Sequence, residues 1–89
     1  MSANDETRLP ADEDTVSVEL DARGLFCPEP VMLLHNKIRD MQSGQKLRLF
    51  ATDPSTTRDV PKFCMYLGHE LLLSETVEGE YHYLIRKKD

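Results

Sequence analysis

A cysteine followed by two closely spaced prolines is the segment of this sequence best suited to chemistry. Apolar residues at helical spacing follow Cys27-Pro28-Glu29-Pro30, so we expect the segment to open a helix. A helix N-terminus favours a thiolate, whereas the carboxylate of Glu29 disfavours one. The prolines should stiffen the turn and fix the direction of the sulfur. The pattern predicts an exposed, ionisable thiol; the alternative is a small apolar side chain beneath a loop.

The second cysteine has a different setting. Cys64 shares an apolar stripe with Val60, Phe63 and Leu67, which is typical of a core thiol. A single reactive cysteine with no recognisable general base argues against a hydrolase and favours thiol exchange with partner proteins. The two cysteines have neither CxxC nor zinc-ligand spacing, so we expect no metal and no cofactor on this chain.

Two helices are expected around these cysteines. Cys27 is the expected N-cap of the first helix, whose apolar stripe runs from Val31 to Met41 and which Gly44 ends. Gly24, in the loop before it, suggests a special backbone angle. Thr57 is the expected N-cap of the second helix, because Pro61 should lie in the first turn, and Gly68 should end it.

The remaining residues predict strands. Residues 16–20 and 46–51 alternate apolar and polar side chains, and 71–77 and 81–86 flank a turn at 78–80. The order is β-α-β-α-β-β. We therefore expect an α+β fold, a two-layer sandwich in which two helices cover one face of a four-stranded mixed sheet.

Charge divides the 89 residues into two parts. Residues 1–15 hold five acids and one base, whereas 16–89 hold 11 acids and 10 bases, for a total of −5. We expect 1–15 to be a disordered acidic tail and 16–89 a single domain. A nearly neutral body is a poor match for phosphate backbone, so we expect no direct nucleic-acid binding. No apolar run is long enough to span a bilayer, so we expect no membrane association. The polar N-terminus lacks the pattern of a signal peptide, so we expect a cytoplasmic location.

Two motifs together resemble the TusA-like (SirA-like) sulfur carrier family. The first is Leu20-Asp-Ala-Arg-Gly-Leu-Phe-Cys-Pro-Glu-Pro30, and the second is Asp53-Pro-Ser-Thr-Thr-Arg-Asp-Val-Pro-Lys-Phe-Cys64. The ending Tyr83-Leu-Ile-Arg-Lys87 is also similar, so that the match covers about residues 19–88. The family fold is a βαβαββ sandwich shared with the C-terminal domain of bacterial translation initiation factor three.

The resemblance implies a sulfurtransferase role. Cys27 would accept sulfane sulfur from a PLP-dependent cysteine desulfurase as a persulfide and pass it to a downstream sulfur-relay protein, for 2-thiolation of the tRNA wobble uridine. Asp53, Arg58 and Tyr66 match family residues implicated in partner docking. The chain departs from the family at His35-Asn36, where the pattern has a basic pair.

Other functions remain open on the sequence. Sulfur supply to molybdenum cofactor synthesis or to sulfur oxidation would use the same thiol. A regulatory or RNA-contacting module could share the fold. A thiol oxidoreductase would need Cys27 and Cys64 to act as a pair.

Overall fold

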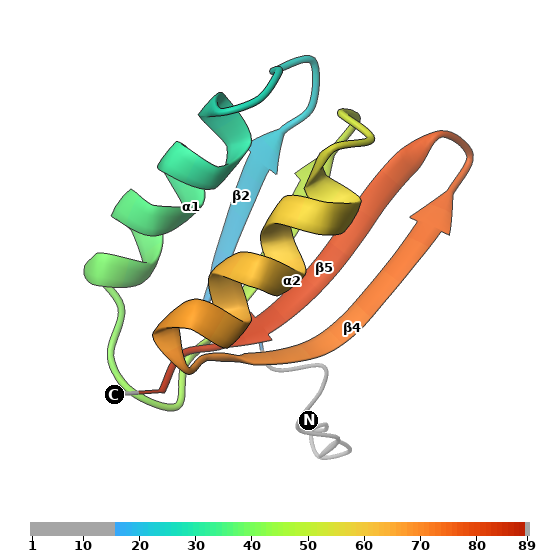
Figure 1. Cartoon of the computed structure of the whole chain (residues 1–89). Coiled ribbons are helices and arrows are strands. Elements are labelled where there is room, and N and C mark those ends of the chain that lie inside the picture. The colour runs from blue at the N-terminus through green and yellow to red at the C-terminus, as the bar shows by residue number, and fades with distance from the viewer. Residues whose placement is uncertain (1–15, 89) are drawn as a thin grey trace, which may run out of the picture.

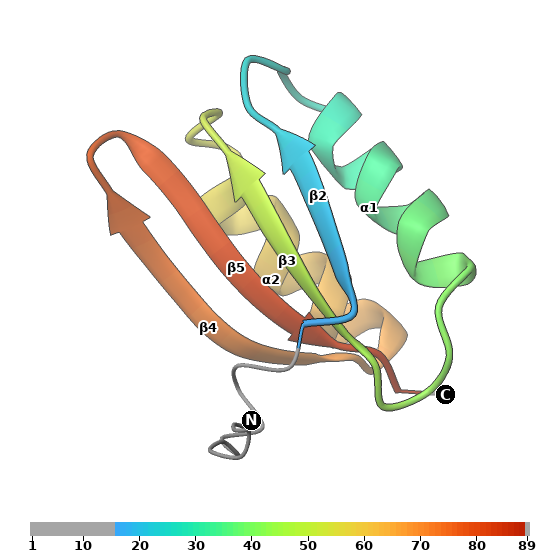
Figure 2. The ribbon, with the colours of Figure 1, turned by 180° about the vertical axis from the view of Figure 1, so that it is seen from behind.

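The computed structural model describes residues 16–88, which form two helices packed on a four-stranded sheet. In chain order the elements are β2 (Val18–Ala22), α1 (Glu29–Arg39), β3 (Lys46–Ala51), α2 (Thr56–Leu67), β4 (Glu70–Val77) and β5 (Glu80–Arg86). Both helices lie on the same side of the sheet, as Figures 1 and 2 show from opposite directions. The predicted α+β two-layer sandwich is therefore confirmed. The predicted tail, 1–15, lies outside the described residues, and its boundary stays a prediction.

The sheet topology brings the ends of two strands together. The strand order is β2-β3-β5-β4, with β2 parallel to β3 and the other two pairings antiparallel. Because β2 and β3 are parallel neighbours, their carboxyl ends lie at the same edge of the sheet. The loops that lead from β2 into α1 and from β3 into α2 therefore lie side by side (Figure 1).

The core fills the space between the helices and the sheet. On β3, Leu47, Leu49 and Ala51 are fully buried, as the alternating pattern predicts for one face of a strand. Leu34 on α1 and Val60 on α2 are also fully buried. This packing fixes both helices, and thereby the loops that precede them, on the sheet.

The start and end of α1 differ from the prediction. The N-cap is Pro28, so Cys27 lies one residue outside the predicted position and Pro30 is the second helical residue. The helix ends at Arg39, well before Gly44. Its last turn tightens, because the N–H groups of Asp40 and Met41 donate to carbonyls three residues back.

The start of α2 also differs from the prediction. Ser55, not Thr57, is the N-cap, and Pro61 lies inside the helix instead of in its first turn. Side chains at the entrance explain the early start. The hydroxyls of Thr56 and Thr57 donate to the carbonyls of Asp53 and Pro54, which winds the chain before Thr57. Gly68 is the C-cap with a left-handed φ of 79°, as predicted.

The strand boundaries shift by one or two residues. The first strand covers Val18–Ala22 instead of 16–20, and the hairpin strands begin one residue earlier than predicted, at Glu70 and Glu80. The hairpin turn therefore has two residues, Glu78 and Gly79. Both have positive φ, 51° and 82°, which matches a type I′ turn.

Candidate functional site

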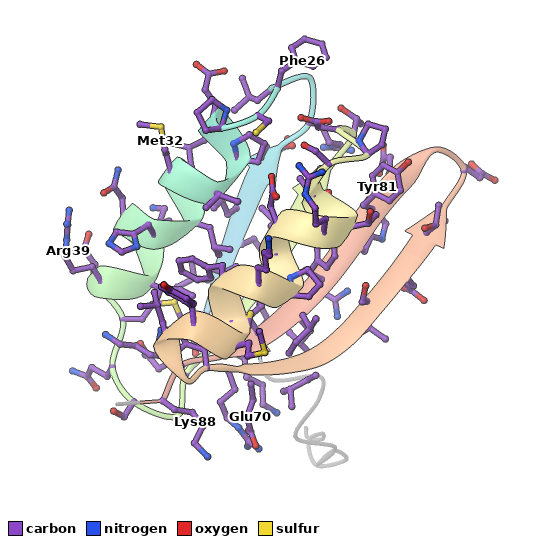
Figure 3. The ribbon with its side chains drawn as sticks, in the orientation of Figure 1. Phe26, Met32, Arg39, Glu70, Tyr81 and Lys88 are labelled. Atoms are coloured by element: carbon purple, nitrogen blue, oxygen red, sulfur yellow. The ribbon has the colours of Figure 1, made fainter. Side chains whose placement is uncertain are left out.

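Cys27 lies at the sheet edge where β2 and β3 both end. It belongs to the loop between Ala22 and Glu29, next to the loop that carries Asp53 (Figure 1). The Cys27 side chain is exposed, as predicted. The exposed Phe26 projects outward from the same loop (Figure 3). The thiol is thus open to another molecule.

Asp53 holds the backbone of Cys27. Its Oδ2 accepts the Cys27 N–H at 2.6 Å, and its Oδ1 accepts the Ser55 N–H at 3.0 Å. The hydrogen bonds from Ser55 and Cys27, together with the charge of Arg58, hold the pKa of Asp53 below its usual value. One carboxylate therefore joins the two neighbouring loops.

Gly24 supports the same loop from its other end. Its φ of 82° lies in the left-handed region, which confirms the predicted special backbone angle. Its N–H donates to Thr52 Oγ1 at 2.8 Å. The loop that carries Cys27 is thus fixed to the β3–α2 connection at two points.

A carboxylate lies next to the sulfur. The Cys27 thiol donates to Asp59 Oδ2, with 3.6 Å between the sulfur and the oxygen. The other oxygen of Asp59 accepts from Arg58 Nε at 3.1 Å. The sequence analysis does not identify Asp59 as a site residue, because no local pattern links it to a cysteine 32 positions earlier.

The start of α1 offers few amide donors. Of the four residues from Pro28 to Val31, the two prolines have no N–H, and the N–H of Glu29 donates to Phe26 O at 2.8 Å. The Glu29 side chain is exposed in this first turn. Stabilisation of a Cys27 anion by the helix N-terminus therefore stays a prediction, and the sulfur contact that the structure describes is to a carboxylate.

An apolar groove begins beside Cys27. It has a volume of about 580 Å³ and lies between α1 and α2. Its lining includes Pro28, Val31 and His35 on one side and Asp59, Phe63 and Tyr66 on the other. Tyr66 is 89% exposed and its neighbour Met65 76%. Two large, exposed side chains thus line the groove.

The three predicted docking residues occupy different settings. Arg58 and Tyr66 are exposed, and Tyr66 lines the groove. Asp53 is only 9% exposed, and both of its oxygens accept hydrogen bonds from this chain. The structure brings Asp53 and Arg58 to Cys27, directly or through Asp59, and it places Tyr66 further along the groove.

Cys64 is a core residue, as predicted. It is 2% exposed, and burial raises the pKa of its thiol to about 11. It packs with Val60 and Phe63 in the main hydrophobic cluster, and both cysteines are free thiols. This burial disfavours a redox pair with Cys27.

Residues 16–88 lack two features, a grouped set of metal ligands and a bilayer-spanning helix. Within this range, no three His, Cys, Asp or Glu side chains are grouped to hold a metal ion. None of its helices has the length and apolar character needed to cross a bilayer.

The sequence and the fold are similar to those of known proteins. The family described as Sulfurtransferase TusA matches residues 18–87. A sulfur carrier protein TusA of Pseudomonas syringae is 60% identical over 79 residues, which are 89% of this chain and 94% of that protein. One from Pseudomonas aeruginosa is 60% identical over 74 residues, 83% of this chain and 94% of that protein.

A solved structure supports the fold independently. The SirA-like protein of Desulfitobacterium hafniense has a TM-score of 0.67 to this chain at 20% identity, covering 81% of this chain and 99% of that one. At this identity the likeness concerns the fold alone.

Proposed function

Because the chain belongs to the TusA family of sulfurtransferases, we propose that Cys27 carries sulfur as a persulfide between partner proteins. The observation that carries the proposal is the exposed Cys27 thiol, fixed by Asp53 at the mouth of an apolar groove. Thiol exchange needs a sulfur atom that the sulfur of a partner protein can approach, and the exposed Cys27 meets this requirement.

The transfer conserves atoms and electrons. The Cys27 thiol loses its proton and attacks the outer sulfur of a donor cysteine persulfide. A new S–S bond forms at Cys27 as the S–S bond of the donor breaks, and the departing donor thiolate takes up a proton. In the second step a thiol of the acceptor attacks the outer sulfur on Cys27 in the same way, and Cys27 leaves as the thiolate.

The partners are proposed from the chemistry and the family. A PLP-dependent cysteine desulfurase would supply the persulfide, with the PLP bound to that enzyme and not to this chain. A downstream relay protein would take the sulfur onward in the cytoplasm, for 2-thiolation of the tRNA wobble uridine. We propose that both dock over the groove, where Tyr66 offers a large apolar surface. Arg58, which pairs with the groove residue Asp59, would add an exposed cation at its side.

Asp53 has a different role in this proposal. Its carboxylate is occupied by the N–H groups of Cys27 and Ser55, so we assign it to holding the thiol loop. Direct contact of Asp53 with a partner stays a prediction.

Intact mass spectrometry tests the proposal. The protein is incubated with a cysteine desulfurase and cysteine, and its mass is compared before and after reduction. We expect a reducible gain of one sulfur atom. The gain should vanish in Cys27→Ser and persist in Cys64→Ser, because Cys64 is buried.

Three outcomes would overturn the proposal. An unchanged mass would show that the chain does not accept sulfur. A gain that survives Cys27→Ser would place the sulfur elsewhere. Tight, salt-sensitive binding of tRNA by this chain alone would favour an RNA-contacting module instead.

A further inference from the structure

A carboxylate contacts the Cys27 sulfur. The thiol donates to Asp59 Oδ2 at 3.6 Å, and Asp59 Oδ1 accepts from Arg58 Nε at 3.1 Å. The Asp59 side chain is 23% exposed, whereas that of Arg58 is 67% exposed. The three side chains form a chain of contacts from a thiol, through a shielded carboxylate, to a solvent-exposed cation.

This arrangement ties the S–H of Cys27 to a negatively charged acceptor. A carboxylate that accepts the S–H fixes the direction of the sulfur, and its charge opposes the negative charge that the sulfur carries as it attacks. Arg58 reduces this effect, since its positive charge offsets part of the charge of Asp59. The contacts alone thus fix the direction of each effect on attack by the sulfur: Asp59 opposes it and Arg58 weakens that opposition.

The other charged groups around Cys27 have settings that differ from that of Asp59. The Asp53 carboxylate lies against the Cys27 N–H, and its oxygens are held by backbone donors. Glu29, on the first turn of α1, has an exposed side chain. Lys62 lines the groove with Asp59. Asp59 is the carboxylate that contacts the sulfur itself.

We propose that Asp59 is a positioning residue that binds the Cys27 S–H and restrains attack by its sulfur in the free protein, and that Arg58 sets how strongly it does so. The proposal rests on the proposed function, in which Cys27 is the sulfur carrier. The free protein would then react slowly with oxidants and alkylating agents although its thiol is exposed. Because Asp59 lines the groove, a protein docked there would change the charge environment of this carboxylate and release the thiol for attack.

Alkylation by iodoacetamide, without any partner, tests the proposal. The rate at Cys27 is followed by mass spectrometry of the full chain and assigned to a peptide. Asp59→Asn should react roughly three- to tenfold faster at neutral pH, because the negative charge beside the sulfur is lost. Arg58→Gln should react more slowly than the native protein, because the charge of Asp59 is no longer offset.

The double variant separates a charge effect from a structural one. Arg58→Gln combined with Asp59→Asn should react like Asp59→Asn alone, since Arg58 acts through Asp59. A loosened loop would instead speed the reaction in both single variants. Glu75→Gln, an exposed residue on β4, is the matched control for net charge and should leave the rate unchanged.

The outcomes distinguish this inference from the proposed function. The inference is overturned if Asp59→Asn leaves the rate unchanged, or if Glu29→Gln produces the acceleration instead. In that case sulfur loading of Cys27 by a desulfurase would still uphold the carrier function. Absence of loading in the native protein would overturn the carrier function, whatever the alkylation rates are.

Discussion

Asp53 stabilises the loop of Cys27 across 26 positions of sequence. Its carboxylate accepts hydrogen bonds from two backbone N–H groups. Hydrogen bonds to a charged carboxylate are stronger than those to a neutral oxygen. Two connections between strand and helix are thereby held by one side chain. The position of the thiol therefore depends on Asp53 as well as on the prolines beside Cys27.

The ionisation of Asp53 should make the loop sensitive to acid. In the unfolded chain the carboxyl titrates near pH 4, and in the fold its pKa is lower because of the hydrogen bonds from Ser55 and Cys27. Its stabilising contribution is therefore complete above about pH 4. It is lost as the pH falls through the lower pKa of the folded state. Asp53→Asn should be less stable than the native protein at neutral pH, and the difference should shrink in acid.

Urea denaturation at several pH values measures this difference. Circular dichroism is the suitable signal, because the chain has no tryptophan. Asp40→Asn, an exposed carboxylate at the end of α1, serves as the control. A stability difference for Asp53→Asn that stays constant down to strongly acidic pH would contradict the assignment.

At the scale of single elements, the hairpin between β4 and β5 contains a locally unfavourable residue. Glu78 has a φ of 51°, a left-handed conformation that side chains with a Cβ rarely adopt. The pairing of Val77 with Glu80 leaves a two-residue turn, and a type I′ turn requires positive φ at both positions. The geometry of the turn thus overrides the preference of Glu78 for a negative φ.

Glu78→Asn should stabilise the protein by about 0.5–1 kcal/mol, because asparagine tolerates the left-handed region and Asn-Gly is the preferred type I′ pair. Thermal or urea unfolding measures the gain. Glu78→Ala is the matched variant, since it removes the same charge but keeps the steric cost. An equal gain in Glu78→Ala would show that charge, and not backbone conformation, is responsible.

At the scale of the whole molecule, one hydroxyl pair joins the sheet to the loop that supports the site. The Thr56 hydroxyl donates to Asp53 O at 2.8 Å and lies 2.9 Å from Tyr83 Oη. Because Thr56 has a single hydroxyl hydrogen, Tyr83 must be the donor in the second contact. The buried core of β5 is thus connected through Thr56 to Asp53, and through Asp53 to Cys27.

Tyr83→Phe should lower the free energy of unfolding by about 1 kcal/mol, through loss of one buried hydrogen bond. Sulfur loading of Cys27 should persist, because Asp53 keeps its backbone contacts. Tyr81→Phe, a half-buried residue of the same strand, is the control and should cost less. Equal stability of Tyr83→Phe and the native protein would show that the hydroxyl contact contributes nothing.

The sequence by itself determined the order of the elements, the two layers and the exposed cysteine before α1. These features depend on local patterns: alternation for strands, helical spacing for helices, and two close prolines that a helix start tolerates better than a helix interior. Local patterns place helix starts less well. Cys27 and Thr57 were each wrong as N-caps, because side-chain contacts within the loops decide where the first turn winds.

Only the tertiary structure decided the surroundings of the thiol. The parallel pairing of β2 with β3 brings Asp53 to the Cys27 amide and Asp59 to its sulfur, across 26 and 32 positions. No periodicity in a sequence encodes which residues of two loops meet, since that depends on strand order and register. The groove between α1 and α2 exists for the same reason: both helices pack on one face of the sheet.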